Sequence, residues 1–144
     1  MSIIGSIIGS IIFVVFLLVF IGGFVFVIMF SIKQITQLSA LNKKKQKEEK
    51  LYEIMILNPS DTTVSNYIKI FLEASDIPKT LRMSGYDSLN SGKSIENKSR
   101  QAQGYQIIMQ SQNVSEEVKQ QLTNAFMAKG VPIQPYTIQA EINL

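Results

Sequence analysis

The first part of the chain is an apolar run without a charged side chain, covering residues 3–32. A bilayer core about 30 Å thick is crossed by roughly 20 helical residues, and at about 1.5 Å per residue this run would reach about 45 Å. Residues 1–32 are therefore predicted to form one transmembrane helix, which tilts, bends at Gly22-Gly23 or extends into the interface. A re-entrant hairpin at the two glycines is the alternative, but its second arm, 24–32, is too short to cross back.

The charges around this run predict its orientation. No basic segment precedes the run and no small-residue cleavage site follows it, so a cleaved signal peptide is rejected. Every nearby lysine lies C-terminal to the run, and the positive-inside rule then places the N-terminus outside and the soluble domain in the cytoplasm. The chain is thus expected to be an integral single-pass membrane protein with this orientation, which only partner proteins would override.

The run begins with a four-residue repeat of small and apolar side chains. On a helix its small residues fall along one side, and such strips allow two helix backbones to approach closely in lipid. This predicts a helix-packing face whose partner is either a second copy of the chain or another membrane subunit. The residues of this face are Ser2, Gly5, Ser6, Gly9 and Ser10.

Residues 33–50 combine apolar side chains at a spacing of three with a lysine-rich end. The pattern predicts a short amphipathic helix or linker beside the membrane rather than a long coiled coil. Basic residues near a membrane surface attract anionic headgroups by about 1 kcal/mol each, and a solvated linker that fixes topology is an equally good interpretation. The predicted membrane-surface residues are Lys43, Lys44, Lys45 and Lys47.

The remaining residues, 51–144, repeat one pattern twice. An apolar run of the strand type is followed by a helix-start cluster, an amphipathic stretch, and an apolar residue before proline, at Ile77-Pro78 and at Val131-Pro132. Two strand–helix–strand units predict an α+β domain, a ferredoxin-like sandwich with a four-stranded antiparallel sheet. The expected strands are 51–57, 77–83, 105–111 and 131–142, and the expected helices are 62–75 and 115–129.

A polar stretch rich in Ser, Asn, Gly and Gln separates the two units. Residues 84–104 are predicted to form a long flexible loop, either an interaction segment or a disordered one. The sequence Ser-Gly-Lys-Ser at 91–94 resembles the end of a P-loop, but Asp87 occupies the position of the first required glycine. No strand leads directly into a helix either, so nucleotide binding by this loop is not expected. The loop residues considered for contacting a partner are Tyr86, Lys93 and Arg100.

Composition argues against several classes of chemistry. The chain has no cysteine and no histidine, which removes disulfides, thiol nucleophiles and the commonest general base near neutral pH. Its carboxylates are scattered singly, with no pair placed for acid–base catalysis or for a metal. From residue 51 on, eight Lys and Arg balance nine Asp and Glu, unlike a nucleic-acid-binding domain. No enzymatic activity, cofactor, metal, nucleic acid or small-molecule substrate is therefore expected.

Three segments of the second half resemble known proteins: Leu51-Tyr52, Phe71-Leu72-Glu73-Ala74-Ser75-Asp76-Ile77-Pro78 and Tyr105-Gln106-Ile107-Ile108. With them, residues 51–144 resemble small ferredoxin-like prokaryotic domains described as signal-transducing. The long loop carrying Tyr86 is similar to that of PII-type nitrogen-signalling proteins, which trimerise and use the loop on membrane targets, although no ligand-binding motif of that family is present. The resemblance implies a bacterial signalling module.

These features predict a non-enzymatic accessory or regulatory subunit of a larger membrane assembly. Its partners would be the lipid bilayer and other membrane subunits, docked through the small α/β domain. The alternative is a self-oligomerising scaffold subunit of a secretion- or pilus-type machine, since the layout also resembles the single-span assembly-platform subunits of such machines. Those subunits expose the domain outside the cytoplasm, which the lysine bias opposes.

Overall fold

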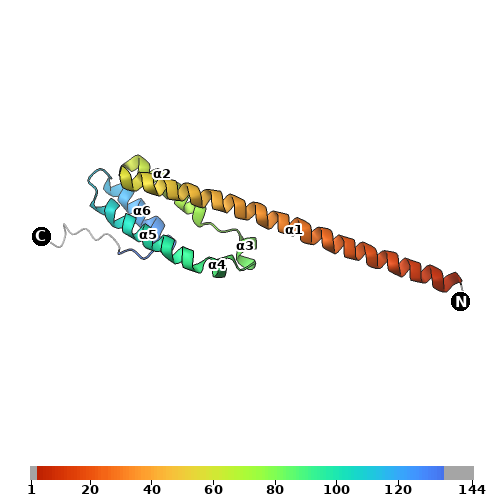
Figure 1. Cartoon of the computed structure of the whole chain (residues 1–144). Coiled ribbons are helices and arrows are strands. Elements are labelled where there is room, and N and C mark those ends of the chain that lie inside the picture. The colour runs from red at the N-terminus through yellow and green to blue at the C-terminus, as the bar shows by residue number, and fades with distance from the viewer. Residues whose placement is uncertain (1–2, 135–144) are drawn as a thin grey trace. The chain divides into compact units, whose positions relative to one another are not determined.

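The computed structural model describes residues 3–134, and every element of regular structure in that range is a helix (Figure 1). The chain divides into two compact units, Met1–Leu38 and Ser39–Leu144, and the first helix contributes residues to both. The helices are α1 (Ile3–Leu57), α2 (Asp61–Ser75), α3 (Lys79–Met83), α4 (Tyr86–Leu89), α5 (Ser91–Gln110) and α6 (Glu116–Ala128).

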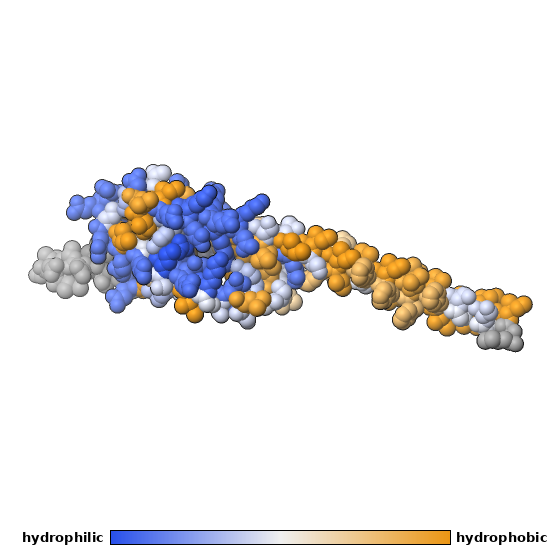
Figure 2. Space-filling view, viewed as in Figure 1, coloured by the Kyte–Doolittle hydropathy of each residue, from blue (hydrophilic) through white to orange (hydrophobic). Residues whose placement is uncertain are grey.

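The first unit is the apolar part of α1, and its large apolar side chains are exposed (Figure 2). No residue of its most apolar stretch is buried within the structure, whereas the core helix of a soluble protein would be mostly buried. By length and composition α1 can cross a membrane. The helix passes through Gly22 and Gly23 without interruption, so the alternative of a hairpin at these glycines is wrong.

The predicted ferredoxin-like sheet is wrong, because the described residues contain no β-strand. Residues 51–57, expected as the first strand, are the last two turns of α1. Residues 105–110 of the expected third strand close α5, and Ser111 is its C-cap. The second strand, 77–83, is replaced by a short connection and α3, and residues 131–134 of the fourth are irregular, its remainder lying outside the described residues.

Helical burial explains why these segments are not strands. Near the end of α1, Met55 is fully buried while Ile54 is half exposed and Leu57 is 85% exposed, so only one side of the segment faces the core. α1 then continues without a helix breaker until Asn58-Pro59, where the proline disfavours the helical conformation of the residue before it.

The same holds for α5, whose buried residues recur at helical spacing over more than two turns. This stripe begins in the segment that was predicted as a loop. Residues 84–104 form α4 and most of α5 instead, so the loop prediction is wrong. The buried residues of the stripe are Gln101, Gly104, Tyr105, Ile108 and Met109.

The two predicted helices of the second half are confirmed, at 61–75 and 116–128. Ser60 caps α2 in a reciprocal capping box with Thr63, in which each side-chain oxygen accepts from the other residue's backbone N–H. Ser115 caps α6 and accepts from the Val118 N–H at 3.3 Å. Asp61 Oδ1 accepts from the Ser115 N–H at 2.7 Å, which ties the starts of the two helices together.

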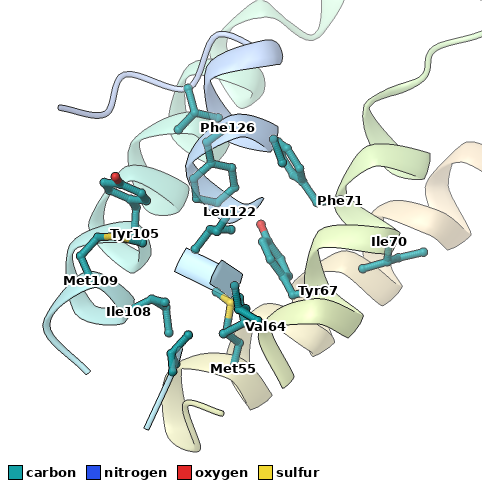
Figure 3. Packing of buried hydrophobic residues seen from close by; sticks show 14 residues of the cluster. Met55, Val64, Tyr67, Ile70, Phe71, Tyr105, Ile108, Met109, Leu122 and Phe126 are labelled. Atoms are coloured by element: carbon teal, nitrogen blue, oxygen red, sulfur yellow. The ribbon is translucent and has the colours of Figure 1, made fainter. Parts of the chain in front are cut away.

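Aromatic side chains from three helices form the centre of the second unit (Figure 3). Phe126 of α6 meets Phe71 of α2 edge to face, with ring centroids 4.9 Å apart, and Tyr67 and Tyr105 lie against the same ring at 6.2 Å. Such pairs stabilise beyond the area they bury, by about 0.5–1.5 kcal/mol each. The Tyr105 hydroxyl shares a hydrogen bond with Thr123, so the polar atom of this buried ring is satisfied.

A smaller apolar cluster joins α3 and α4 to α1. Leu81 and Tyr86 pack on Leu41, with Ile77 at the edge of the cluster. Gly130, which follows α6, has φ of 73° and supports a backbone bond from Val131 to Phe126; this left-handed conformation suits glycine. The chain therefore turns back after α6 and buries Val131 in the main core.

Candidate functional site

A buried carboxylate organises the polar part of the second unit. Glu48 of α1 is only 6% exposed. Its Oε1 accepts from the Tyr67 hydroxyl at 2.6 Å and from the Gln101 amide at 3.2 Å. Arg100 Nη2 lies 3.0 Å from Oε1 and 2.9 Å from Oε2. Three helices, α1, α2 and α5, therefore meet at one carboxylate.

Arg100 is held on its other side by Tyr52. The guanidinium carbon lies 4.4 Å from the centre of the Tyr52 ring, a cation–π distance. The Tyr52 hydroxyl donates to the backbone carbonyl of Arg100 at 2.7 Å. The ring also passes so close to Gly104 that a β-carbon there would stand 2.5 Å from Tyr52 Cε2. Glycine at this position is required by the aromatic side chain that crosses α5.

Burial and neighbouring charges shift the pKa values of this network. Burial raises the pKa of Tyr67 far above its usual range, and the Glu48 charge adds to that rise. Burial also raises the pKa of Tyr52, against the opposing effect of Arg100. For Arg100 burial lowers the pKa, but the hydrogen bond and charge of Glu48 outweigh it, so the net shift is upward. Both phenols stay neutral and Arg100 stays cationic at ordinary pH, and the network acts as a clamp between helices.

A cleft of about 460 Å³ opens beside this clamp, entirely within the second unit. Glu48 and Gln101 form part of its wall, and Phe71, Ile77 and Val131 give it an apolar lining. Five cationic side chains, which come from four different segments of the unit, also line it. They are Lys45, Arg82, Lys93, Lys98 and Lys129.

Comparison with protein-family models, curated proteins and solved structures finds no match. The site is therefore interpreted from its own residues. The ferredoxin-like layout on which the resemblance to signal-transducing and PII-type domains depended is not present in the described residues.

The three residues considered as partner contacts in a loop lie on helices, in different surroundings. Tyr86 is 8% exposed, and its hydroxyl accepts from Lys45 Nζ at 2.5 Å. Arg100 forms an ion pair with Glu48 and a cation–π contact with the Tyr52 ring. Lys93 is exposed in the first turn of α5 and lines the cleft. Only Lys93 therefore presents its charge freely to the surroundings.

The four predicted membrane-surface lysines also separate into two groups. Lys43, Lys44 and Lys47 are exposed on α1. Lys45 is half-buried, lies 4.9 Å from the centre of the Tyr86 ring, and lines the cleft. The structure thus assigns Lys45 to the folded unit.

The predicted helix-packing strip lies on the first unit, except for Ser2, which falls outside the described residues. Gly5, Ser6, Gly9 and Ser10 are exposed. A β-carbon at Gly9 would meet no atom within 4 Å, and Ser10 Oγ donates to the Ser6 carbonyl at 3.0 Å, as polar groups do in apolar helices. Close approach by another helix at this strip remains a prediction.

Sequence reasoning missed the centre of the site. Glu48 stands in a run of charged residues, where a solvated position is the usual interpretation. The available signal was its spacing: Leu41, Glu48 and Met55 are the buried residues of α1 and recur every seven positions, so one side of the helix faces a core.

In residues 3–134 no group of three His, Cys, Asp or Glu residues is placed to hold a metal ion.

Proposed function

We propose that this chain is a non-enzymatic accessory or regulatory subunit of a larger membrane assembly, anchored by one span and docking a partner through its helical unit. The single observation that supports this most is the division of α1. Its first part has no buried residue in its most apolar stretch, whereas its last part enters a closed core through Met55. An anchor and a folded unit are therefore joined by one helix.

The positive-inside rule supports a cytoplasmic position for the helical unit, with the N-terminus outside. Lys33 and the lysine-rich segment that begins at Lys43 both follow the apolar run. The exposed lysines Lys43, Lys44 and Lys47 are suited to anionic headgroups, which attract them by about 1 kcal/mol each near the surface. Anchoring and orientation then come from the same segment of the chain.

Docking is supported by large apolar side chains that the helical unit leaves exposed. Leu57 is 85% exposed, Leu89 84% and Met83 78%. Single exposed apolar residues are common. Here three large apolar side chains are almost fully exposed, each is the last residue of its helix, and none belongs to the core. Contact with a partner subunit would remove this apolar surface from water.

Purification of the tagged full chain from its own membranes in mild detergent tests the proposal. The proposal predicts a complex of defined stoichiometry with other membrane subunits, measured by mass-resolved sizing and mass spectrometry. The variant Leu57→Ser/Leu89→Ser should lose the partner, because it removes exposed contacts without touching the core. The matched variant Ser6→Leu/Gly9→Leu, in the first unit, should retain it.

The alternative, a self-oligomerising scaffold, gives a different result in the same experiment. It predicts homo-oligomers that survive in the Leu57→Ser/Leu89→Ser variant and dissociate in the Ser6→Leu/Gly9→Leu variant, because the small-residue strip would carry the contact. A lone monomer would contradict both assembly proposals.

A further inference from the structure

We infer that the basic cleft of the helical unit binds a phosphate-bearing anion, either the headgroup of an anionic phospholipid or a soluble phosphate compound. This inference goes beyond partner docking, since it assigns a ligand class to a specific cavity. The cleft has a volume of about 460 Å³, within the range of about 300–1,000 Å³ that is usual for small-ligand sites.

The cationic side chains that line the cleft outnumber the carboxylates that line it. Five cationic side chains line it, against the carboxylates of Glu48, Glu49 and Asp87. Glu48 is already paired with Arg100, which is not one of the lining residues. Asp87 lies 4.0 Å from Arg82 in an exposed pair, an arrangement that contributes little. One acidic residue, Glu49, is left to oppose the lysines.

The lysines themselves have few internal partners. Lys45 donates to the Tyr86 hydroxyl and forms no ion pair with a carboxylate in the described residues. Within residues 3–134, Lys93, Lys98 and Lys129 form no ion pair with a carboxylate. Like charges that share a concave surface repel one another and focus a positive potential in it. A bound anion would relieve that repulsion.

The lining also fits phosphate better than an extended acidic chain. The hydroxyl of Ser94 and the amide of Asn97 lie among the lysines and are neutral hydrogen-bond donors. Lysine is a regular phosphate ligand that acts as a point charge. The apolar side of the cleft, with Phe71 and Ile77, places low-polarity surface beside the lysines, and charge interactions near such surface are stronger than in bulk water.

This site does not depend on the incomplete P-loop pattern. Lys93 and Ser94 belong to that pattern, but they line the cleft together with residues from α1, α3 and the segment after α6. Lys98 and Lys129, separated by 31 positions in the sequence, line the same cavity. The ligand would be held by side chains from several segments rather than by a glycine-rich backbone.

The test uses the full chain in nanodiscs and two phosphate probes. In discs of phosphatidylcholine, inorganic pyrophosphate is titrated by calorimetry. In separate discs, part of the phosphatidylcholine is replaced by phosphatidic acid, and the thermal midpoint of the helical unit is measured by tyrosine circular dichroism. The cleft variant is Lys93→Gln/Lys98→Gln/Lys129→Gln. The matched control, Lys50→Gln/Lys69→Gln/Lys79→Gln, removes the same charge from exposed positions outside both the cleft and the predicted membrane-surface lysines.

A soluble ligand predicts pyrophosphate binding that is weakened about tenfold or more in the cleft variant, since each lost charged hydrogen bond costs about a factor of ten, and is nearly unchanged in the control. A lipid ligand predicts no pyrophosphate binding, but a raised midpoint in phosphatidic acid discs for the wild type and the control and not for the cleft variant. Both variants should fold without ligand, and the midpoint shows whether they do. Absence of both effects, or equal losses in the two variants, would overturn the inference.

Discussion

Arg100 Nη2 lies 2.9 Å from one carboxylate oxygen of Glu48 and 3.0 Å from the other, although 52 residues separate them in the chain. The Glu48 side chain is 7% exposed and that of Arg100 28%. An ion pair that contains a buried carboxylate is costly to break, because the charge that remains after one partner is removed stays desolvated. The pair therefore fixes how α5 lies on α1.

Glu48→Ala is expected to destabilise the helical unit by about 3 kcal/mol, because it leaves Arg100, Tyr67 and Gln101 without their acceptor. Arg100→Ala should cost at least as much, about 3–5 kcal/mol, since it leaves the buried Glu48 carboxylate without its counter-charge. In the double variant the two losses should fall short of their sum by about 1–2 kcal/mol. Urea unfolding in micelles, followed by tyrosine circular dichroism, measures each term. Strict additivity would show that the two side chains are not in contact.

Tyrosine signals report on the helical unit alone. All five tyrosines lie at or after residue 52 and the chain has no tryptophan. The membrane unit therefore contributes no aromatic signal of this kind, and the unfolding measurements need no truncation of the chain.

Gly104→Ala is expected to destabilise the unit by about 1–3 kcal/mol, as overpacking does, because the new methyl group would collide with the Tyr52 ring. Gly92→Ala, in the same helix, meets no atom within 4 Å and should be neutral or stabilise by up to about 1 kcal/mol. Thermal midpoints of the two variants give the comparison. Replacing Tyr52 by leucine should relieve most of the penalty at Gly104, and an unchanged penalty would contradict this packing.

Ser99→Pro distinguishes α5 from the loop predicted at this position. In the interior of a helix proline removes a backbone hydrogen bond and clashes with the preceding turn, at a cost of about 3 kcal/mol or more. Gln112→Pro is the control, because the residue before it, Ser111, is extended with ψ of 132°, as proline requires. Equal and small effects of both substitutions on the unfolding midpoint would contradict the helix and support the predicted loop.

High pH should destabilise the unit through Tyr67. An unfolded tyrosine ionises near its ordinary pKa of about 10, whereas burial and Glu48 raise the pKa of folded Tyr67 well above it. The stabilisation from this group is complete below about pH 10 and is lost as pH rises, since the unfolded chain then binds fewer protons. Tyr67→Phe should flatten the fall in thermal midpoint between about pH 9.5 and 11. The raised pKa of Tyr52 preserves part of the slope.

The parts of the fold that were predicted from the sequence have strong local signals. The apolar run before Lys33, the amphipathic stretches of α2 and α6 and the helix-start clusters before them each have a local physical cause, and the structure has helices there. The run 105–110 has no such unique cause, because a short apolar segment suits a buried strand and a buried helix equally well. The deciding residues were Gln101 and Gly104, which extend its stripe backwards at helical spacing.

The site was less accessible to sequence reasoning than the fold. Lysines in polar stretches are usually solvated, and nothing local indicates that Lys45, Lys98 and Lys129 line one cleft. Their association depends on how the second half of α1 packs against α5 and α6, which depends in turn on long-range contacts such as Glu48 with Arg100. Patterns of charge along the chain do not contain that information.

The measurement that tests the account most directly is residue-specific labelling of the anchored chain in intact cells. Since the protein has no cysteine, single cysteines at Ser2 and at the exposed Ser65 of α2 can be compared with a membrane-impermeant maleimide. With the N-terminus outside and the helical unit in the cytoplasm, Ser2→Cys should be labelled in intact cells and Ser65→Cys only after lysis, with both proteins resisting carbonate extraction. Labelling of Ser65→Cys in intact cells, or release of the chain by carbonate, would contradict a membrane-anchored cytoplasmic unit.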